Sequence, residues 1–271
     1  MTERGPQAPD TNAIYVYAVC RAEAPLNLAG LIGVTRDEPV RALPIGSLTA
    51  IVQGVRSAEF TDEAWKERLT DEAELERYAR AHHTVVSQVA AGTPTVPLPL
   101  ATLYQGEDRA RAALDNESPR FHRALSRIAH HAEWGVKVYA PKPSRDEEGS
   151  ASAERPKDTV PTRPAPGAGR AYLDRKRNLQ ARREQRQGES LRVAEAVDAD
   201  VSRIAKASRR LRPHGHGAAG DHRVQVLNAT YLVADDRAGE LDVLASSLRE
   251  RTGAEIELSG PWVPYSFVGE V

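Results

Sequence analysis

One segment of the chain constrains the fold more than any other. Residues 141–169 are rich in Pro, Ser, Glu, Arg and Gly and contain almost no large apolar side chains. Such a segment buries too little apolar surface to offset the entropy lost on ordering, so it does not belong to a packed core. The 271 residues also suffice for two domains, since an ordinary domain needs about 100 to 200 residues. We therefore predict two domains on either side of this segment.

The predicted boundaries follow from that segment. They are a disordered leader at 1–12, an N-terminal domain at 13–141, a flexible linker at 142–169 and a C-terminal domain at 170–271. Both domains mix helix and strand patterns, so the predicted fold class is α+β.

The N-terminal domain begins with strand patterns and continues with helical ones. The predicted elements, in chain order, are a strand at 14–20, a hairpin of 39–45 and 47–55 around Gly46, a long helix or kinked pair from Thr61 to Val85, a short edge strand within 93–100, a helix at 106–131 that restarts at Ser118-Pro119, and a strand at 134–139. Alternation, turn residues and apolar spacing carry these assignments. This order predicts a ferredoxin-like sheet with helices on one face.

The C-terminal domain is predicted to contain a long, highly charged helix at 171–211. Val197, Val201 and Ile204 keep a three-four spacing there, which is a narrow seam for packing on one partner surface. A strand at 224–234, a helix at 238–252 and a strand at 254–259 follow. This domain has too few strands in the sequence to repeat the first.

The sequence carries no motif for catalysis, a cofactor or a metal. Phosphate-binding loops, dinucleotide fingerprints, HExxH and GxSxG are all absent. The pairs His82-His83 and His130-His131 cannot each hold one metal, because adjacent helical residues point about 100° apart. His214, His216 and His222 lack cysteine or acidic partners at zinc-like intervals. We predict no catalytic residue, no cofactor and no metal.

Charge and composition point to a protein partner. Lys plus Arg number 37 and Asp plus Glu 38, so no overall field favours nucleic acid or an anionic membrane. No window is apolar enough to span a membrane, and residues 1–12 do not resemble a secretory signal. The single cysteine, Cys20, closes the apolar run AIYVYAVC, which predicts a buried strand thiol in a reducing cytoplasm. We predict a cytoplasmic protein.

Two segments are candidate contact surfaces. The first half of the long helix is the most basic stretch, with Arg175, Arg177 and Arg182 among its cations, and fits either a solvated face or a docking surface for an acidic partner. The terminal GPWVPYSFV contains two prolines, which end a strand ladder. We expect its rings to pack into a neighbouring groove and to lock the C-terminal domain, either on itself or against the N-terminal domain, with direct partner contact as the alternative.

Seven blocks, taken in order, resemble the GvpF/GvpL family of gas vesicle proteins. They are IYVYAV, HHTVV, TVPLPLATLY, WGVKVY, GRAYLDRKR, NATYLVADD and GPWVPYSFV. The terminal block is the most specific, because the family typically ends its last strand with GPWPPYSF; here Val263 replaces the first proline of the pair. TVPLPLATLY also departs from the family, which more often has an Arg-Phe-Gly-like stretch there.

The resemblance implies a non-enzymatic accessory or minor structural protein of the gas vesicle. Its implied work is to bind the hydrophobic shell protein and to support vesicle assembly, together with other accessory proteins. The candidate partner-binding residues are Val96, Leu98, Arg175, Arg177, Arg182, Trp262, Tyr265 and Phe267. Two other hypotheses stay open: a ferredoxin-like regulatory module that binds a small ligand, and a metal-dependent enzyme that uses the histidines.

Overall fold

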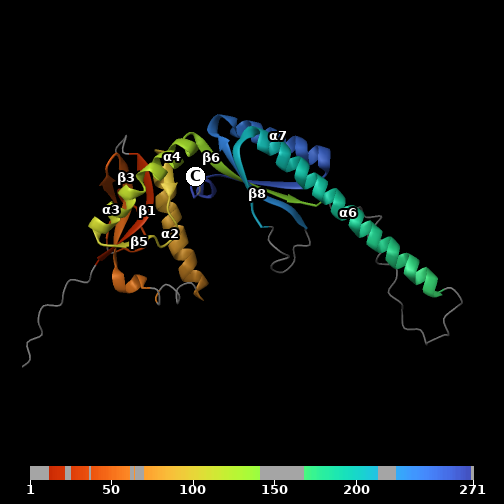
Figure 1. Ribbon diagram of the computed structural model, residues 1–271, viewed down its shortest axis with the longest axis horizontal. Helices are drawn as coiled ribbons and strands as arrows, with labels where there is room; N and C mark the ends of the chain where they lie inside the picture. Colours follow the sequence, from red (N-terminus) through yellow and green to blue (C-terminus); the bar gives the residue numbers. More distant parts are fainter. Residues whose placement is uncertain are drawn as a thin grey trace, which may run out of the picture. The chain divides into compact units, whose positions relative to one another are not determined.

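The computed structural model describes residues 12–21, 26–36, 38–61, 64, 70–140, 168–212 and 224–269 (Figure 1). The chain forms two compact units. The first unit takes the residues up to Glu133 and those from Gly260 onward, and the second takes Trp134–Ser259. Residues 1–11 of the predicted leader and most of the predicted linker lie outside the described residues, whereas Asn12 belongs to the first strand.

The first unit is a five-stranded antiparallel sheet with helices. Its elements are β1 (Asn12–Arg21), β2 (Arg41–Ile45), β3 (Leu48–Arg56), η1 (Ser57–Phe60), α2 (Glu72–Ala90), β4 (Thr95–Pro97), β5 (Leu103–Gln105), α3 (Glu107–Asn116) and α4 (Ser118–Ile128). The strand order is β2-β3-β1-β4, and β5 also pairs with β1. The predicted hairpin is present, because Ile45 pairs with Leu48 across a turn in which Gly46 has φ 57°.

Helices cover both faces of the first sheet, whereas the sequence predicted helices on one face only (Figure 1). Side chains of β1 that include Val16 and Val19 pack against α3 and α4, and those that include Tyr15 and Tyr17 pack against α2. The reason is visible in β1, whose residues are nearly all apolar, since a strand buried on both faces loses the alternation of polar and apolar side chains. Burial also raises the pKa of the Cys20 thiol to about 11, as expected for a strand thiol in the core.

The second unit is a four-stranded sheet in the order β7-β8-β6-β9. Its elements are β6 (His131–Tyr139), α6 (Ala168–Ile204), β7 (Ala205–Arg210), β8 (Gln225–Ala234), η2 (Asp235–Arg237), α7 (Ala238–Thr252) and β9 (Glu255–Trp262). Val197 and Val201 of α6 share one apolar cluster with Leu241 and Leu248 of α7. Both helices therefore pack on the same face of this sheet.

Two predicted assignments differ from the structure of this unit. The sequence predicts that the strand at 134–139 belongs to the N-terminal domain, but this strand pairs in the second sheet. The boundary between the two units therefore falls at 133/134 rather than within 142–169. The long helix ends at Ile204 rather than at 211, and residues 205–210 form the edge strand β7. The buried β8 needs hydrogen-bond partners along its second side, and β7 supplies them. The second unit therefore repeats the strand order of the first. The prediction that it has too few strands to do so is wrong, because β6 and β7 supply the two strands that the sequence had not assigned to it.

Candidate interaction surfaces

The residues Gly260–Val268, here called the C-terminal strap, belong to the first unit. The backbone N–H and the hydroxyl of Ser266 both donate to the carboxylate of Glu133, at 2.8 and 2.6 Å. Phe267 is 4% exposed, and Val268 joins the apolar cluster of α3 and α4. A buried ring and a double hydrogen bond thus anchor the strap, which agrees with the prediction of packing against the N-terminal domain.

The other two rings of the strap reach the surface. Trp262 is 50% exposed and Tyr265 is 38% exposed. Both lie beside the imidazole of His83 on α2, with ring centroids 6.2 and 6.1 Å from it. Partial burial nevertheless raises the pKa of Tyr265 to about 12. Phe267 is therefore the buried ring of the strap, and Trp262 with Tyr265 forms an aromatic surface patch.

The remaining predicted contact residues lie in two other places. Val96 and Leu98 belong to the core under α4 and are 2% and 7% exposed, so their side chains are not available to a partner in this conformation. Arg177 and Arg182 are exposed on the first half of α6, and Arg175 lies on the same stretch. The eight predicted residues therefore form no single site.

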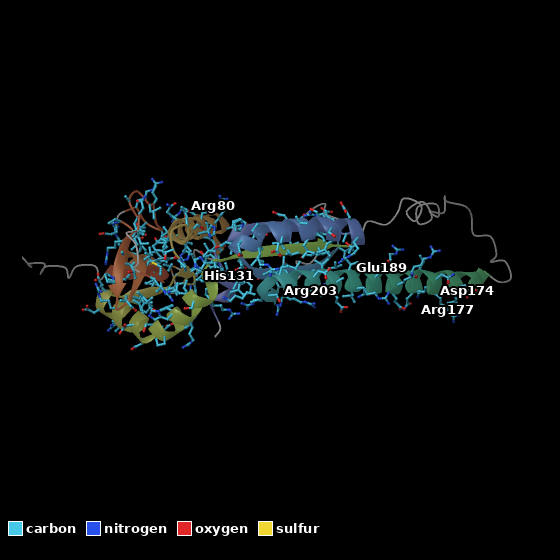
Figure 2. The ribbon with its side chains drawn as sticks, turned by 90° about the horizontal axis from the view of Figure 1, so that it is seen from above. Arg80, His131, Asp174, Arg177, Glu189 and Arg203 are labelled. Carbon is cyan, nitrogen blue, oxygen red and sulfur yellow. The ribbon has the colours of Figure 1, made fainter. Side chains whose placement is uncertain are left out.

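The first half of α6 extends beyond the sheet of its unit (Figure 1). Figure 2 shows Asp174 and Arg177 projecting from it, and Glu189 projecting further along the helix. Leu173 and Leu179 are 52% and 54% exposed in this half, and Leu191 is 54% exposed just beyond it. This helix surface combines apolar and cationic side chains, which suits contact with another protein.

The histidine pair on α2 has a structural environment. His82 is buried, its Nδ1 lies 2.9 Å from the hydroxyl of Tyr15, and its Nε2 has no hydrogen-bond partner among the described atoms. Burial lowers the pKa of His82 to about 4, so this imidazole is neutral at physiological pH. His83 instead faces the strap. Within the described ranges, no group of three or more His, Cys, Asp or Glu side chains is placed to hold a metal ion, and His214, His216 and His222 lie outside those ranges.

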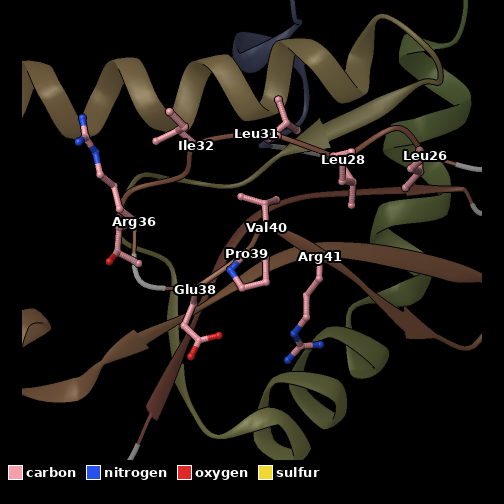
Figure 3. Close-up of a pocket in the computed structure, with 12 residues that line it drawn as sticks. Leu26, Leu28, Leu31, Ile32, Arg36, Glu38, Pro39, Val40 and Arg41 are labelled. Carbon is pink, nitrogen blue, oxygen red and sulfur yellow. The ribbon is translucent and has the colours of Figure 1, made fainter.

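The sequence did not predict a further surface, which lies on the chain segment that joins β1 to β2. Residues 26–36 and 38–41 line a groove of about 890 Å³, here called the loop groove (Figure 3). Its apolar lining includes Leu26, Leu28, Leu31, Ile32 and Val40. The available signal was the run LNLAGLIGV, in which large apolar residues follow neither the helix nor the strand period and two glycines interrupt them.

A buried glutamine fixes the shape of this loop. Gln53 accepts from the hydroxyl of Tyr17 at 2.5 Å, and its amide donates to the carbonyls of Thr35 and Glu38 at 2.9 and 2.6 Å. The N–H of Val34 donates to the Tyr17 hydroxyl at 2.9 Å. The loop is therefore held by a buried polar network, and the groove is preformed.

Taken together, the fold and these surfaces define a class: a two-unit α+β protein with exposed apolar and aromatic side chains. No helix in the described part of the chain is long and apolar enough to cross a membrane. The model of the family described as "Gas vesicle synthesis protein GvpL/GvpF" matches residues 13–269. The chain therefore belongs to the GvpL/GvpF family of gas vesicle proteins.

Two relatives agree with this assignment, and two solved structures share the fold. The chain is 37% identical over 258 residues to gas vesicle protein L of Streptomyces sp. (strain CB03234), covering 94% of this chain and 92% of the relative. It is 22% identical over 272 residues to gas vesicle protein L1 of Halobacterium salinarum, covering 96% and 92%. The crystal structure of GvpF from Anabaena sp. PCC7120 has a TM-score of 0.64 at 14% identity and covers 96% of this chain and 97% of that one. GvpF from Microcystis aeruginosa gives a TM-score of 0.59 at 13% identity, covering 95% and 99%.

Proposed function

We propose that this protein is a non-enzymatic accessory component of gas vesicles that binds the hydrophobic shell protein and supports its assembly. The family match over residues 13–269 carries the proposal, because it ties nearly the whole chain to gas vesicle synthesis. The names of the relatives point the same way. Other gas vesicle accessory proteins are further proposed partners.

A physical argument supports a covering role. A subunit destined to line a gas-facing surface exposes more apolar area than a soluble monomer tolerates, so it aggregates unless a partner covers it before polymerisation. The aromatic patch of Trp262 and Tyr265 and the exposed leucines of α6 are surfaces able to cover it. The cations of α6 then select the orientation of the partner.

We further propose that both units are variants of the ferredoxin-like arrangement. The second unit runs β6-α6-β7-β8-α7-β9 with the strand order β7-β8-β6-β9. The first unit has the same chain order and the same sheet order, in its elements β1, β2, β3, α2 and β4. Its described residues between β1 and β2 form a loop, where the second unit has α6. This element order is that of the split βαβ fold.

Deletion and binding experiments test the functional proposal together. A strain that lacks this gene is expected to lose buoyant vesicles, and the purified protein is expected to capture the shell protein. The paired change Arg177→Glu and Arg182→Glu should weaken capture without loss of stability, since both side chains are exposed. Arg80→Glu, at an equally solvent-facing position of α2, is the matched control. Buoyant vesicles in the deletion strain, together with no capture, would refute the proposal.

A further inference from the structure

The two units differ at one position in their shared element order. Between its first two strands the second unit has α6, whose Val197 and Val201 pack on the sheet beside α7. Between its first two strands the first unit has the loop of residues 26–40 in the described part, and α2 is the helix that packs on that face. The loop therefore takes the place that α6 has in the element order of the second unit, and the loop groove is formed by this loop.

The groove is open and apolar at its centre. Leu26, Leu28 and Leu31 are only partly buried against the apolar cluster of α2, and Ile32 is 63% exposed. Its volume of about 890 Å³ is large enough for several apolar side chains, because pockets that bury whole drug-sized ligands measure about 300 to 1,000 Å³. Gln53 and Tyr17 hold the loop in place. Because the loop is already ordered, binding of a partner costs little conformational entropy in the loop.

The edge beside the groove is a poor template for an added strand. β2 is five residues long, and Pro44 within it has no N–H to donate. Pro39 precedes it and lacks a donor as well. Prolines and short length are the features that block pairing at sheet edges. A helix is therefore the element that fits, as in helix-in-groove recognition.

The charged side chains around the groove determine which charges a bound helix needs on its two flanks. Arg36 and Glu38 are exposed at the rim, and among the described residues neither side chain makes an ion pair (Figure 3). Arg41 is already bound to Glu107 at 2.6 Å. A helix with an acidic side chain facing Arg36 and a basic one facing Glu38 complements this rim in one orientation only.

We propose that the loop groove binds an amphipathic helix of a gas vesicle protein, on the loop that stands where the second unit has α6. The apolar stripe of that helix lies on Leu28, Leu31 and Ile32, and its acidic flank pairs with Arg36. This assignment rests on the proposed function for the origin of the helix. The groove geometry itself comes from this chain alone.

Site-specific photo-crosslinking tests the assignment in the full-length protein. A benzophenone side chain at position 32 is expected to capture the shell protein, or another vesicle protein produced with it, within a segment that has an apolar helical stripe and an acidic flank. The same probe at position 243, where Val243 is 71% exposed on α7 of the other unit, is the matched control and should give no such adduct. Ile32→Glu should weaken binding about tenfold or more, and Val243→Glu should leave it unchanged. Arg36→Glu should weaken binding and should recover it when the captured acidic residue is changed to Lys.

The outcomes separate this inference from the proposed function. Shell-protein binding that withstands Ile32→Glu and Arg36→Glu overturns the groove assignment and leaves the function standing. A wild-type protein that binds no vesicle protein overturns both. Adducts from position 32 that reach only the same chain or a second copy, or that map to an extended segment, also overturn the assignment. So does a metabolite whose stabilising effect in a thermal-shift screen is lost in Ile32→Glu, because the groove is then a small-ligand site.

Discussion

The anchoring of the C-terminal strap can be tested by comparing two ring deletions. Phe267→Ala removes a ring that is 4% exposed, whereas Trp262→Ala removes one that is 50% exposed. The larger residue is therefore the less buried one. If the strap is an anchor of the first unit, the deletion of the smaller ring must destabilise that unit more.

The expected magnitudes follow from burial. Removing a fully buried Phe leaves a cavity and costs about 3 to 5 kcal/mol. Half burial of Trp262 covers on the order of 100 Å², and at about 25 cal/mol per Å² its loss costs at most about 2.5 kcal/mol. The centroid of the Trp262 ring also lies 6.2 Å from that of the His83 imidazole, within the range of aromatic pairs. We therefore expect the Phe267 variant to be the less stable one, by about 0.5 to 2.5 kcal/mol when the Trp262 loss is at its upper limit.

Hydrogen exchange followed by mass spectrometry is the suitable assay, because two units need not unfold in one transition. Peptides from β1 and α2 should lose protection in Phe267→Ala, and peptides from β8 and α7 serve as the internal reference. A larger loss of protection in Trp262→Ala than in Phe267→Ala would show that the strap is held by its exposed ring, and the reasoning from burial would be wrong.

Three further perturbations test other parts of the structure. Ser266→Ala keeps the backbone bond to Glu133 but removes the 2.6 Å hydroxyl bond, so it should cost about 1.5 to 3 kcal/mol in denaturant unfolding; a neutral result argues against the double anchor. The pKa of His82 falls from 6.5 to about 4 on folding. The contribution of this neutral imidazole to the free energy of unfolding is therefore fully present above pH 6.5 and is lost as the pH falls toward 4. Wild type should lose about 2.5 kcal/mol more than His82→Gln between pH 7.5 and 4.5, and parallel pH profiles contradict this. Gly33→Ala places a Cβ 2.3 Å from the Gln53 amide oxygen, so we expect a loss of about 1 to 3 kcal/mol and faster exchange in the loop. Unchanged exchange there means that the polar network does not hold the loop.

Local patterns predicted most of the individual elements. The run at 14–20, the hairpin around Gly46 and the restart at Ser118-Pro119 all appear where the sequence placed them. Gly253 ends α7 in the left-handed conformation with φ 65°, as a glycine after a helix does. These features depend on residues that are adjacent in the sequence, so the sequence alone determines them.

Partner choice between distant segments was not predictable in the same way. The pattern of β6 predicts a strand, but its pairing in the second sheet depends on the strands it meets there. Residues 205–210 continue a helical pattern yet form β7, because the open side of β8 requires hydrogen bonds. Helices on both faces of β1 likewise follow from packing, to which its apolar run adds only a hint.

The candidate surfaces show the same division. The sequence alone predicted that a strand ends within the strap and that the first half of α6 carries dense positive charge. In the structure β9 runs through Pro261 to Trp262, so only Pro264 follows its end. Only the tertiary structure decided that Val96 and Leu98 are core residues, that Phe267 is buried while Trp262 is exposed, and that the loop of residues 26–40 leaves a groove. The physical reason is that burial of a side chain depends on which distant segments pack over it, and one local sequence pattern is compatible with several such neighbours.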